Sequence, residues 1–254
     1  MKLATLNLWN DKETWSIRKD LIIEEIMNLK ADIIALQEVP DQLELLSILE
    51  GTGISYYSFK EYMDDTEGLA VLSKFPLESV SVQNELFNRC AMRVTVNIDG
   101  LIIGITNVHL TWKSAAEREK EILEVINVIS EDTHTDYEIL CGDFNSKPNV
   151  SSIYNYLTGE ISINSSDTSW VDLGQSLNTP TLDFRNNKWL YDRDNLNKIR
   201  NPVRYDWILL RSCYPKKEPE ISSHGLFANR TMGLNKMFPS DHYGFFIDLC
   251  FLNE

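Results

Sequence analysis

Short apolar runs alternate with amphipathic helical segments along most of this 254-residue chain. The run at 101–109 follows an Asp99-Gly100 turn signal and is typical of a strand in a hairpin. The segment 114–130 instead carries Ile122, Val125 and Ile129 on one side of a helix. The pattern recurs in both halves of the chain. We therefore expect an α/β fold in which two mixed sheets pack face to face, with helices outside.

The same pattern sets the expected elements. Strands are predicted at 2–8, 31–37, 56–59, 69–73, 80–82, 92–98, 101–109, in the run that ends at Asp143, and at 204–211 and 242–252; helices are predicted at 16–30, 40–49, 114–130 and 150–157. The polar segment 158–199 is long for a structureless stretch, so we expect surface loops with short strands there. Because no repeat or composition break divides the chain, we expect a single domain over residues 1–254.

The chain has a formal charge of −14, from 24 Lys and Arg against 38 Asp and Glu. A surface of this sign repels polyanions, so we expect no strong non-specific nucleic-acid binding. The four cysteines show no C-x-x-C spacing and imply no disulfide framework. No window approaches the roughly 18 apolar residues of a membrane span, and the N-terminal residues lack the apolar core of a signal peptide. We expect a cytoplasmic monomer with no membrane partner.

Polar residues suited to phosphoester chemistry stand at or just beyond the predicted strands. They are Asn7, Glu38, His109, Asp143, Asn145, Asp206, Asp241 and His242. Polar groups at apolar strand ends cost free energy unless they are paired or liganded, and strand ends are where sites collect in α/β sheets. Carboxylates and amides supply oxygen ligands for Mg²⁺ and a base for water, and imidazoles supply donors for phosphoryl oxygens. The set predicts metal-assisted phosphoester cleavage.

Each of these residues alone also has a structural interpretation. Asn7 could form a turn, Glu38 could stabilise the N-terminus of the helix at 40–49, and His109 could be an interior histidine. A histidine that acts as a cation near phosphate needs a carboxylate to hold its tautomer and raise its pKa. Asp241 is a poor partner for His242, because adjacent residues of a strand point to opposite faces. Asp206, on another apolar strand, is the expected partner.

Taken in order, the motifs resemble the endonuclease/exonuclease/phosphatase superfamily of Mg²⁺-dependent phosphoester hydrolases. They are Thr5-Leu-Asn7, Ala35-Leu-Gln-Glu38, Gly68-Leu-Ala-Val-Leu-Ser-Lys74, Thr106-Asn-Val-His109, Gly142-Asp143-Phe-Asn145, Arg204-Tyr-Asp206 and Ser240-Asp241-His242. The resemblance implies a four-layer α/β-sandwich and a phosphoester substrate.

The resemblance also implies residue roles. Glu38, helped by Asn7, would hold the catalytic Mg²⁺, for which Mn²⁺ could substitute, and Asp241 would act nearby or on a second ion. Asp143 would position or deprotonate the attacking water. Asn145 and His109 would bond the non-bridging phosphoryl oxygens, and His242, oriented by Asp206, would stabilise the charged transition state.

Within the superfamily, three stretches look most like the 5′-tyrosyl-DNA phosphodiesterases. These are HLTWKSAAER at 109–118, WVDLG at 170–174 with TPT at 179–181, and FPSDHYG at 238–244. Leu6 and Leu182 stand where that group has tryptophan. Arg118 is a candidate substrate-binding residue, because a guanidinium can stack on an aromatic leaving group. The implied activity is a phosphodiesterase acting on a nucleic-acid end, a nucleotide or a 5′-phosphotyrosyl-like ester.

Three alternatives stay open. Sphingomyelinases share the superfamily, and the opening Thr5-Leu-Asn-Leu-Trp9 resembles theirs, although −14 disfavours anionic bilayers. A small-molecule phosphomonoesterase would suit an acidic surface. A scaffold that has lost catalysis is the non-enzyme alternative, but such a module has no need of the full acid, amide and imidazole set.

Overall fold

Two six-stranded sheets form the centre of the molecule. The computed structural model describes residues 1–62, 67–177, 179–191 and 200–251. The first sheet has the order β11 (Glu220–Phe227), β12 (Gly244–Cys250), β1 (Lys2–Asn7), β2 (Ile33–Val39), β4 (Gly68–Ser73) and β3 (Tyr56–Glu61). The second has the order β5 (Leu77–Ser79), β6 (Ala91–Ile98), β7 (Leu101–His109), β8 (Tyr137–Asp143), β10 (Asp206–Arg211) and β9 (Trp170–Asp172). Both are mixed, because β1–β2 and β7–β8 are parallel pairs among antiparallel ones.

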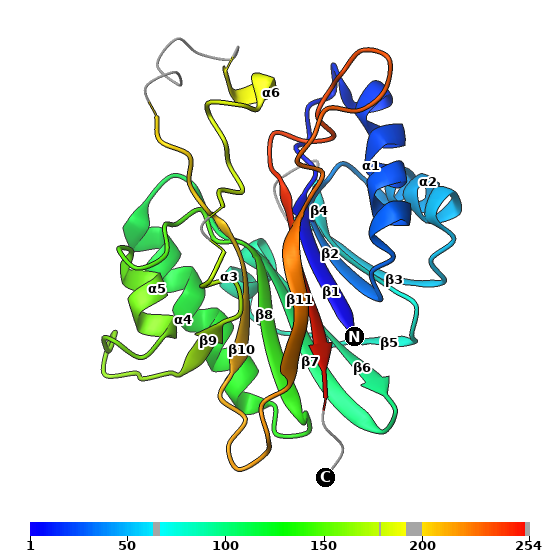
Figure 1. Ribbon diagram of the computed structural model, residues 1–254. Coiled ribbons are helices and arrows are strands. Elements are labelled where there is room, and N and C mark those ends of the chain that lie inside the picture. The colour runs from blue at the N-terminus through cyan, green and yellow to red at the C-terminus, as the bar shows by residue number, and fades with distance from the viewer. Residues whose placement is uncertain (63–66, 178, 192–199, 252–254) are drawn as a thin grey trace.

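Helices cover the outer face of each sheet (Figure 1). Against the first sheet lie α1 (Trp15–Leu29) and α2 (Gln42–Thr52); against the second lie α3 (Glu85–Cys90), α4 (Ala115–Glu131) and α5 (Ser152–Leu157), while the short α6 (Lys188–Tyr191) lies beyond the strand ends. The result is the expected four-layer α/β-sandwich.

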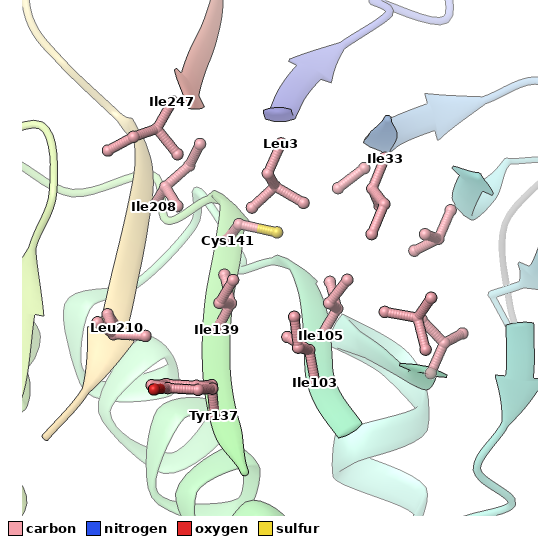
Figure 2. Close-up of a cluster of buried hydrophobic side chains, with 14 of the residues drawn as sticks. Leu3, Ile33, Ile103, Ile105, Tyr137, Ile139, Cys141, Ile208, Leu210 and Ile247 are labelled. Carbon is pink, nitrogen blue, oxygen red and sulfur yellow. The ribbon is translucent and has the colours of Figure 1, made fainter. Parts of the chain in front are cut away.

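The layering explains why the strands are apolar on both faces. Leu3 and Ile33 project into the core between the sheets, where they meet Ile105, Ile139 and Ile208 of the other sheet (Figure 2). Their chain neighbours belong to a separate core beneath α1 and α2. A strand buried on both faces gives a continuous apolar run instead of an alternating one.

Most of the predicted elements are confirmed, and the differences have local causes. The strand predicted at 80–82 is wrong, because β5 ends at Ser79 and 80–84 have no regular structure. The second helix begins at Gln42, since Asp41 and not Pro40 caps it: Asp41 accepts a hydrogen bond from the Glu44 amide at 2.8 Å. Three elements were missed: the six-residue α3, the four-residue α6 and the edge strand β11, whose exposed residues carry no apolar run.

The segment 158–199 consists mainly of loops where it is described, as expected, but it is not confined to the surface, because Trp170, Thr181 and Asn187 are buried. It holds β9, α6 and an isolated bridge between Ile163 and Ser166. The prediction for 178 and 192–199 falls outside the described residues, as does that for 252 at the end of the last strand. Within the described ranges, no helix is long and apolar enough to cross a membrane.

Candidate active site

Four strands from the two sheets end at the same edge of the sandwich. The parallel pairing of β1 with β2 sets Asn7 opposite Gln37, one residue before Glu38. In the other sheet, the pairing of β7 with β8 sets His109 opposite Asp143, and β10 sets Asp206 opposite Asp143 from the far side. Register aligns the strand ends within each sheet, and the packing of the two sheets then brings Asn7 and Asp143, 136 positions apart, into hydrogen-bond contact.

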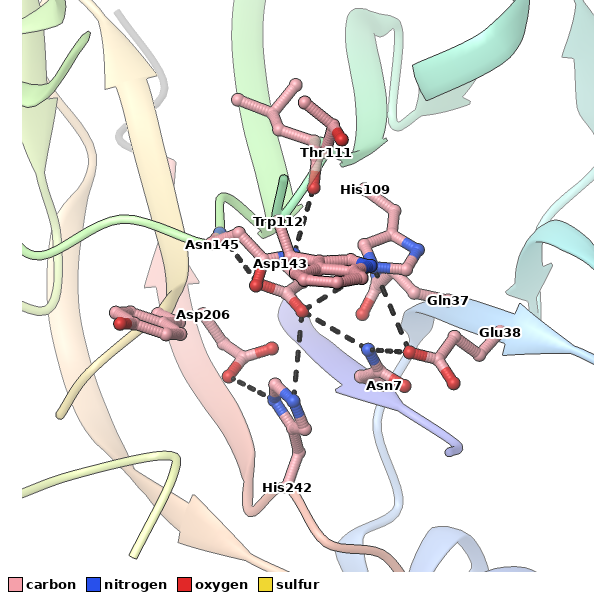
Figure 3. Close-up of polar contacts among 12 residues, drawn as sticks. Asn7, Gln37, Glu38, His109, Thr111, Trp112, Asp143, Asn145, Asp206 and His242 are labelled. Atoms are coloured by element: carbon pink, nitrogen blue, oxygen red, sulfur yellow. Dashed lines mark hydrogen bonds and ion pairs between the residues drawn. The ribbon is translucent and has the colours of Figure 1, made fainter. Parts of the chain in front are cut away.

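Asp143 is the centre of the site (Figure 3). Its side chain is 2% exposed, and its Oδ2 lies 3.8 Å from Nε2 of His109 and 3.8 Å from Nε2 of His242. Asn7 Nδ2 donates to the same oxygen at 3.2 Å. Burial raises the pKa of Asp143 above its ordinary value, although His242 and His109 oppose the shift. The result is a basic carboxylate between two imidazoles.

His242 is held by Asp206, the partner expected for it. Asp206 Oδ2 lies 2.9 Å from His242 Nδ1, and Asp206 is fully buried. Its other oxygen accepts no hydrogen bond from the described residues. Burial alone would lower the pKa of His242, but Asp206 outweighs it, with Asp143 and Asp241 adding to the effect, so that the pKa lies well above its usual range. Asp206 therefore favours the protonated form of this imidazole.

Glu38 sits on a bulge of β2 in the left-handed backbone region, with φ of 52°. A non-glycine residue held there is strained, and such residues gather at functional sites. The carboxylate accepts from Asn7 Nδ2 at 2.9 Å and from the Asn10 amide at 2.9 Å, and its side chain is 23% exposed. Burial acts to raise the pKa of Glu38, but His109 and these two donors leave it lowered. Glu38 is thus an ionised, oriented and accessible carboxylate.

A second acidic side chain stands beside Glu38. Ligand atoms of Glu38, Glu67 and His109 lie within 4.8 Å of one another, and Asn10 Nδ2 donates to Glu67 at 3.2 Å. Two carboxylates and an imidazole suit a divalent cation, and hard ions such as Mg²⁺ favour the oxygens. Asn7 serves this group indirectly, because its amide donates to Glu38 while its oxygen accepts from the Trp9 amide.

His109 and Asn145 border the central carboxylate. His109 Nδ1 lies 3.2 Å from the Tyr62 hydroxyl, which leaves Nε2 facing Glu38 and Asp143. The Asn145 amide N–H donates to Asp143 Oδ1 at 2.8 Å, and its side-chain Nδ2 donates to the Leu110 carbonyl at 2.9 Å. An amide NH₂ carries two hydrogens, so one remains for a ligand.

Asp241 and Arg118 are not drawn into this group. Asp241 is 6% exposed and lies in the turn where Asn187 Nδ2 donates to its carbonyl at 3.1 Å. Among the described residues, candidate metal ligands form two clusters, Glu38 with Glu67 and His109, and Asp143 with Asp206 and His242, and Asp241 belongs to neither. Arg118 directs its guanidinium to the carbonyls of Thr111 and Trp112, at 3.0 and 3.4 Å. The roles predicted for these two residues, as for the rest of the site, remain predictions.

Several residues near the site were missed from the sequence. Glu67, Tyr62 and Asn10 hold or extend the Glu38 group, and Trp112 stands exposed three positions after His109. Glu67 directly precedes the family-like motif that begins at Gly68, and this position beside a motif could have indicated that Glu67 belongs to the site. Nothing in the sequence marks Tyr62 or Asn10.

A buried aspartate between two imidazoles, next to an accessible carboxylate pair on a four-layer α/β-sandwich, defines a hydrolase of phosphoric esters. The family model for the endonuclease/exonuclease/phosphatase family matches residues 4–242, and the chain belongs to this family. A curated relative is carbon catabolite repressor protein 4 homolog 3 of Arabidopsis thaliana, 27% identical over 159 residues. That match covers 56% of this chain and 35% of the relative, so the chain spans about a third of the relative's length.

Solved structures share the fold over nearly the whole chain. A D. rerio TDP2 carrying 14 humanising mutations superposes with a TM-score of 0.75 at 17% identity, covering 97% of each chain. TDP2 of Caenorhabditis elegans gives 0.71 at 18% identity, covering 98% of this chain and 96% of that one. A family protein of Bacteroides vulgatus gives 0.74 at 17% identity, covering 99% and 98%. TDP2 is a 5′-tyrosyl-DNA phosphodiesterase, so the expected resemblance is confirmed at the level of fold.

Proposed function

We propose that this protein is a Mg²⁺-dependent phosphodiesterase that acts on a nucleic-acid end, a nucleotide or a 5′-phosphotyrosyl-like ester. One observation carries the proposal: Asp143 Oδ2 is 3.8 Å from each of two imidazoles, and one of these, His242, is hydrogen-bonded to the buried Asp206 carboxylate at 2.9 Å. A base beside two donors is the arrangement that an attack of water on a phosphate requires.

Asp143 takes the proton of the attacking water. Its raised pKa makes it a stronger base than an exposed aspartate, and its bond from the Asn145 amide fixes the carboxylate plane. Asn7 Nδ2 holds the oxygen that faces the imidazoles. The carboxylate is therefore positioned before substrate arrives, which is what makes a general base effective.

His242 stabilises negative charge on the phosphoryl oxygens as it develops. Asp206 fixes the proton on Nδ1, so Nε2–H is directed toward Asp143 and the space beside it. His109 and the second amide hydrogen of Asn145 supply further donors. Pre-oriented donors cost no reorganisation during the reaction.

The metal would be held by Glu38 and Glu67, with His109 at their side and Asn7 orienting Glu38. When bound, Mg²⁺ polarises the phosphoryl oxygens and offsets their charge. Two carboxylates and an imidazole whose ligand atoms lie within 4.8 Å of one another fit a dication.

The substrate class is supported by charge and by the relatives. A surface with a net charge of −14 favours a ligand held at one phosphate over a long polyanion. One D. rerio TDP2 structure, 17% identical to this chain, holds a single-strand DNA product, and the Arabidopsis relative adds a sequence match. An end of a nucleic acid is the substrate that both considerations favour.

A substrate panel tests the proposal. Bis-p-nitrophenyl phosphate, a 5′-tyrosyl oligonucleotide, sphingomyelin and a sugar phosphate are each incubated with Mg²⁺ or with chelator. We expect bis-p-nitrophenyl phosphate and the 5′-tyrosyl oligonucleotide to be hydrolysed with Mg²⁺ and not with chelator. Release of phosphate from the sugar phosphate alone, or choline phosphate from sphingomyelin alone, would replace this proposal by one of its rivals.

A further inference from the structure

Trp112 is the exposed aromatic residue nearest to the catalytic strand ends along the chain. It follows His109 by three positions, and 74% of it is exposed. In the view of Figure 3 its indole is drawn across Asp143 and toward His109, from the turn that follows β7. A tryptophan left in water at this place forgoes the stabilisation that burial of such a large ring would contribute.

The turn that carries Trp112 is held rigidly to the site. The Leu110 amide donates to the Asp143 carbonyl at 2.9 Å, and Asn145 donates to the Leu110 carbonyl at 2.9 Å. Glu121 accepts from the Thr111 amide at 2.9 Å. Arg118, as described above, donates to the carbonyls of Thr111 and Trp112. The backbone is fixed on both sides, so the indole is presented without an ordering cost for the chain.

We infer that Trp112 is a stacking surface for a planar aromatic ring adjoining the scissile phosphate. The inference rests on the proposed function and adds a specificity-determining residue to it. Base–aromatic stacking needs no positive charge on the protein, and a chain with 24 Lys and Arg against 38 Asp and Glu repels phosphates on balance. Arg118 then acts through the loop as a positioning residue, because its guanidinium is engaged by the turn that bears Trp112.

Two sources can supply such a ring. One is the nucleobase of the first nucleotide, and the other is an aromatic leaving group such as tyrosine.

Four oligonucleotide 5′-phosphodiesters distinguish these two sources. The leaving group is either tyrosyl or methyl, and each is combined with either a thymine or an abasic site in the first nucleotide. KM is measured for wild type, Trp112→Ala and Trp112→Phe with Mg²⁺. Tyr214→Ala is the matched control, because Tyr214 is 90% exposed beyond the opposite end of β10.

We expect Trp112→Ala to raise KM about tenfold for each ester that bears the contacted ring, and to leave the abasic methyl ester unchanged. Trp112→Phe should retain most of the affinity. An effect on the thymine methyl ester identifies the base, and an effect on the abasic tyrosyl ester identifies the leaving group. Because stacking releases no counterions, the factor should persist from 50 to 300 mM KCl, roughly the range over which phosphate contacts weaken.

An equal change in KM for all four esters, or none for any of them, would overturn the stacking role while leaving the proposed function standing. Failure of the wild type to hydrolyse any of the four would instead refute the proposed function, and the stacking role with it. Tyr214→Ala should match the wild type throughout.

Discussion

Asp206 Oδ2 lies 2.9 Å from Nδ1 of His242, and the two residues are 36 positions apart on β10 and in the turn before β12. The residue before His242, Asp241, is not the hydrogen-bond partner of the ring. Its backbone carbonyl accepts a hydrogen bond from Asn187 Nδ2 at 3.1 Å, in the turn that precedes β12. A carboxylate from the other sheet therefore orients the imidazole and raises its pKa. It also links the two sheets at the site.

Asp206→Asn should remove the cation at His242. The amide keeps the size of the carboxylate but loses its charge, so the pKa of His242 should fall from its raised value. With four histidines in the chain, the titration can be followed by NMR. We expect kcat to fall on the order of 10²-fold or more at neutral pH. An unchanged titration would show that Asp206 does not set the charge of His242; Asp99→Asn, in an exposed turn, is the control.

The raised pKa of His242 predicts how stability depends on pH. A group whose pKa is higher in the folded state than in the unfolded state adds stability below its unfolded value, about 6.5. That contribution disappears as pH rises through the folded-state value. Urea unfolding of the metal-free protein should therefore show the gap between wild type and Asp206→Asn narrowing above about pH 6.5. A gap that widens with rising pH would contradict this sign.

Asp143→Asn should abolish turnover while leaving the fold intact. The lost proton acceptor should cost about 10²- to 10⁴-fold in kcat. Because burial disfavours the charged form of Asp143, the neutral amide should not destabilise the protein. Steady-state kinetics with thermal unfolding as the control check both parts. Activity like that of the wild type would exclude Asp143 as the base.

Glu38→Gln should weaken Mg²⁺ binding by at least about tenfold, measured by titration calorimetry, since even partners outside the ligand shell affect affinity by that factor. Glu67→Gln should weaken it as well, by a smaller factor. Glu44→Gln on α2, which pairs with Lys19, supplies a control acidic residue outside the site. If Glu67→Gln binds Mg²⁺ like the wild type, Glu67 is not a ligand.

Arg18 should be important for stability. It is fully buried, and its guanidinium donates to the carbonyls of Leu8 at 2.8 Å, Trp9 at 2.6 Å and Pro239 at 3.0 Å. Arg18→Met removes the donor to the Leu8 and Pro239 carbonyls, while the Trp9 carbonyl keeps the Asp11 amide at 2.7 Å. At about 1–3 kcal/mol for each acceptor left unpaired, we expect a loss of several kcal/mol by denaturant unfolding. Arg89→Met, in an exposed i,i+4 pair with Glu85, should change stability by less than about 0.5 kcal/mol.

Local sequence patterns were sufficient to predict most of the strands and helices of this protein. The apolar runs located most strands, because a strand that is buried on both faces is a continuous apolar run, which can be recognised without knowing which strands pair with it. The elements that were missed had no such signal: β11 is exposed along most of its length, and α3 depends on a cap at Asn84. The motifs also placed the polar residues at strand ends correctly.

Amino-acid order alone determined which residue types stand at the ends of the strands, and through them the family. Only the tertiary structure decided which of these groups meet. The packing of the two sheets against each other brought Asn7 to Asp143 and Asp206 to His242. A bulge of β2 holds Glu38 near Glu67, and Asp241 lies outside both clusters of candidate ligands among the described residues. The reason is physical: register and bulges are set by packing between chain segments far apart in sequence, and no local pattern encodes a distance across two sheets.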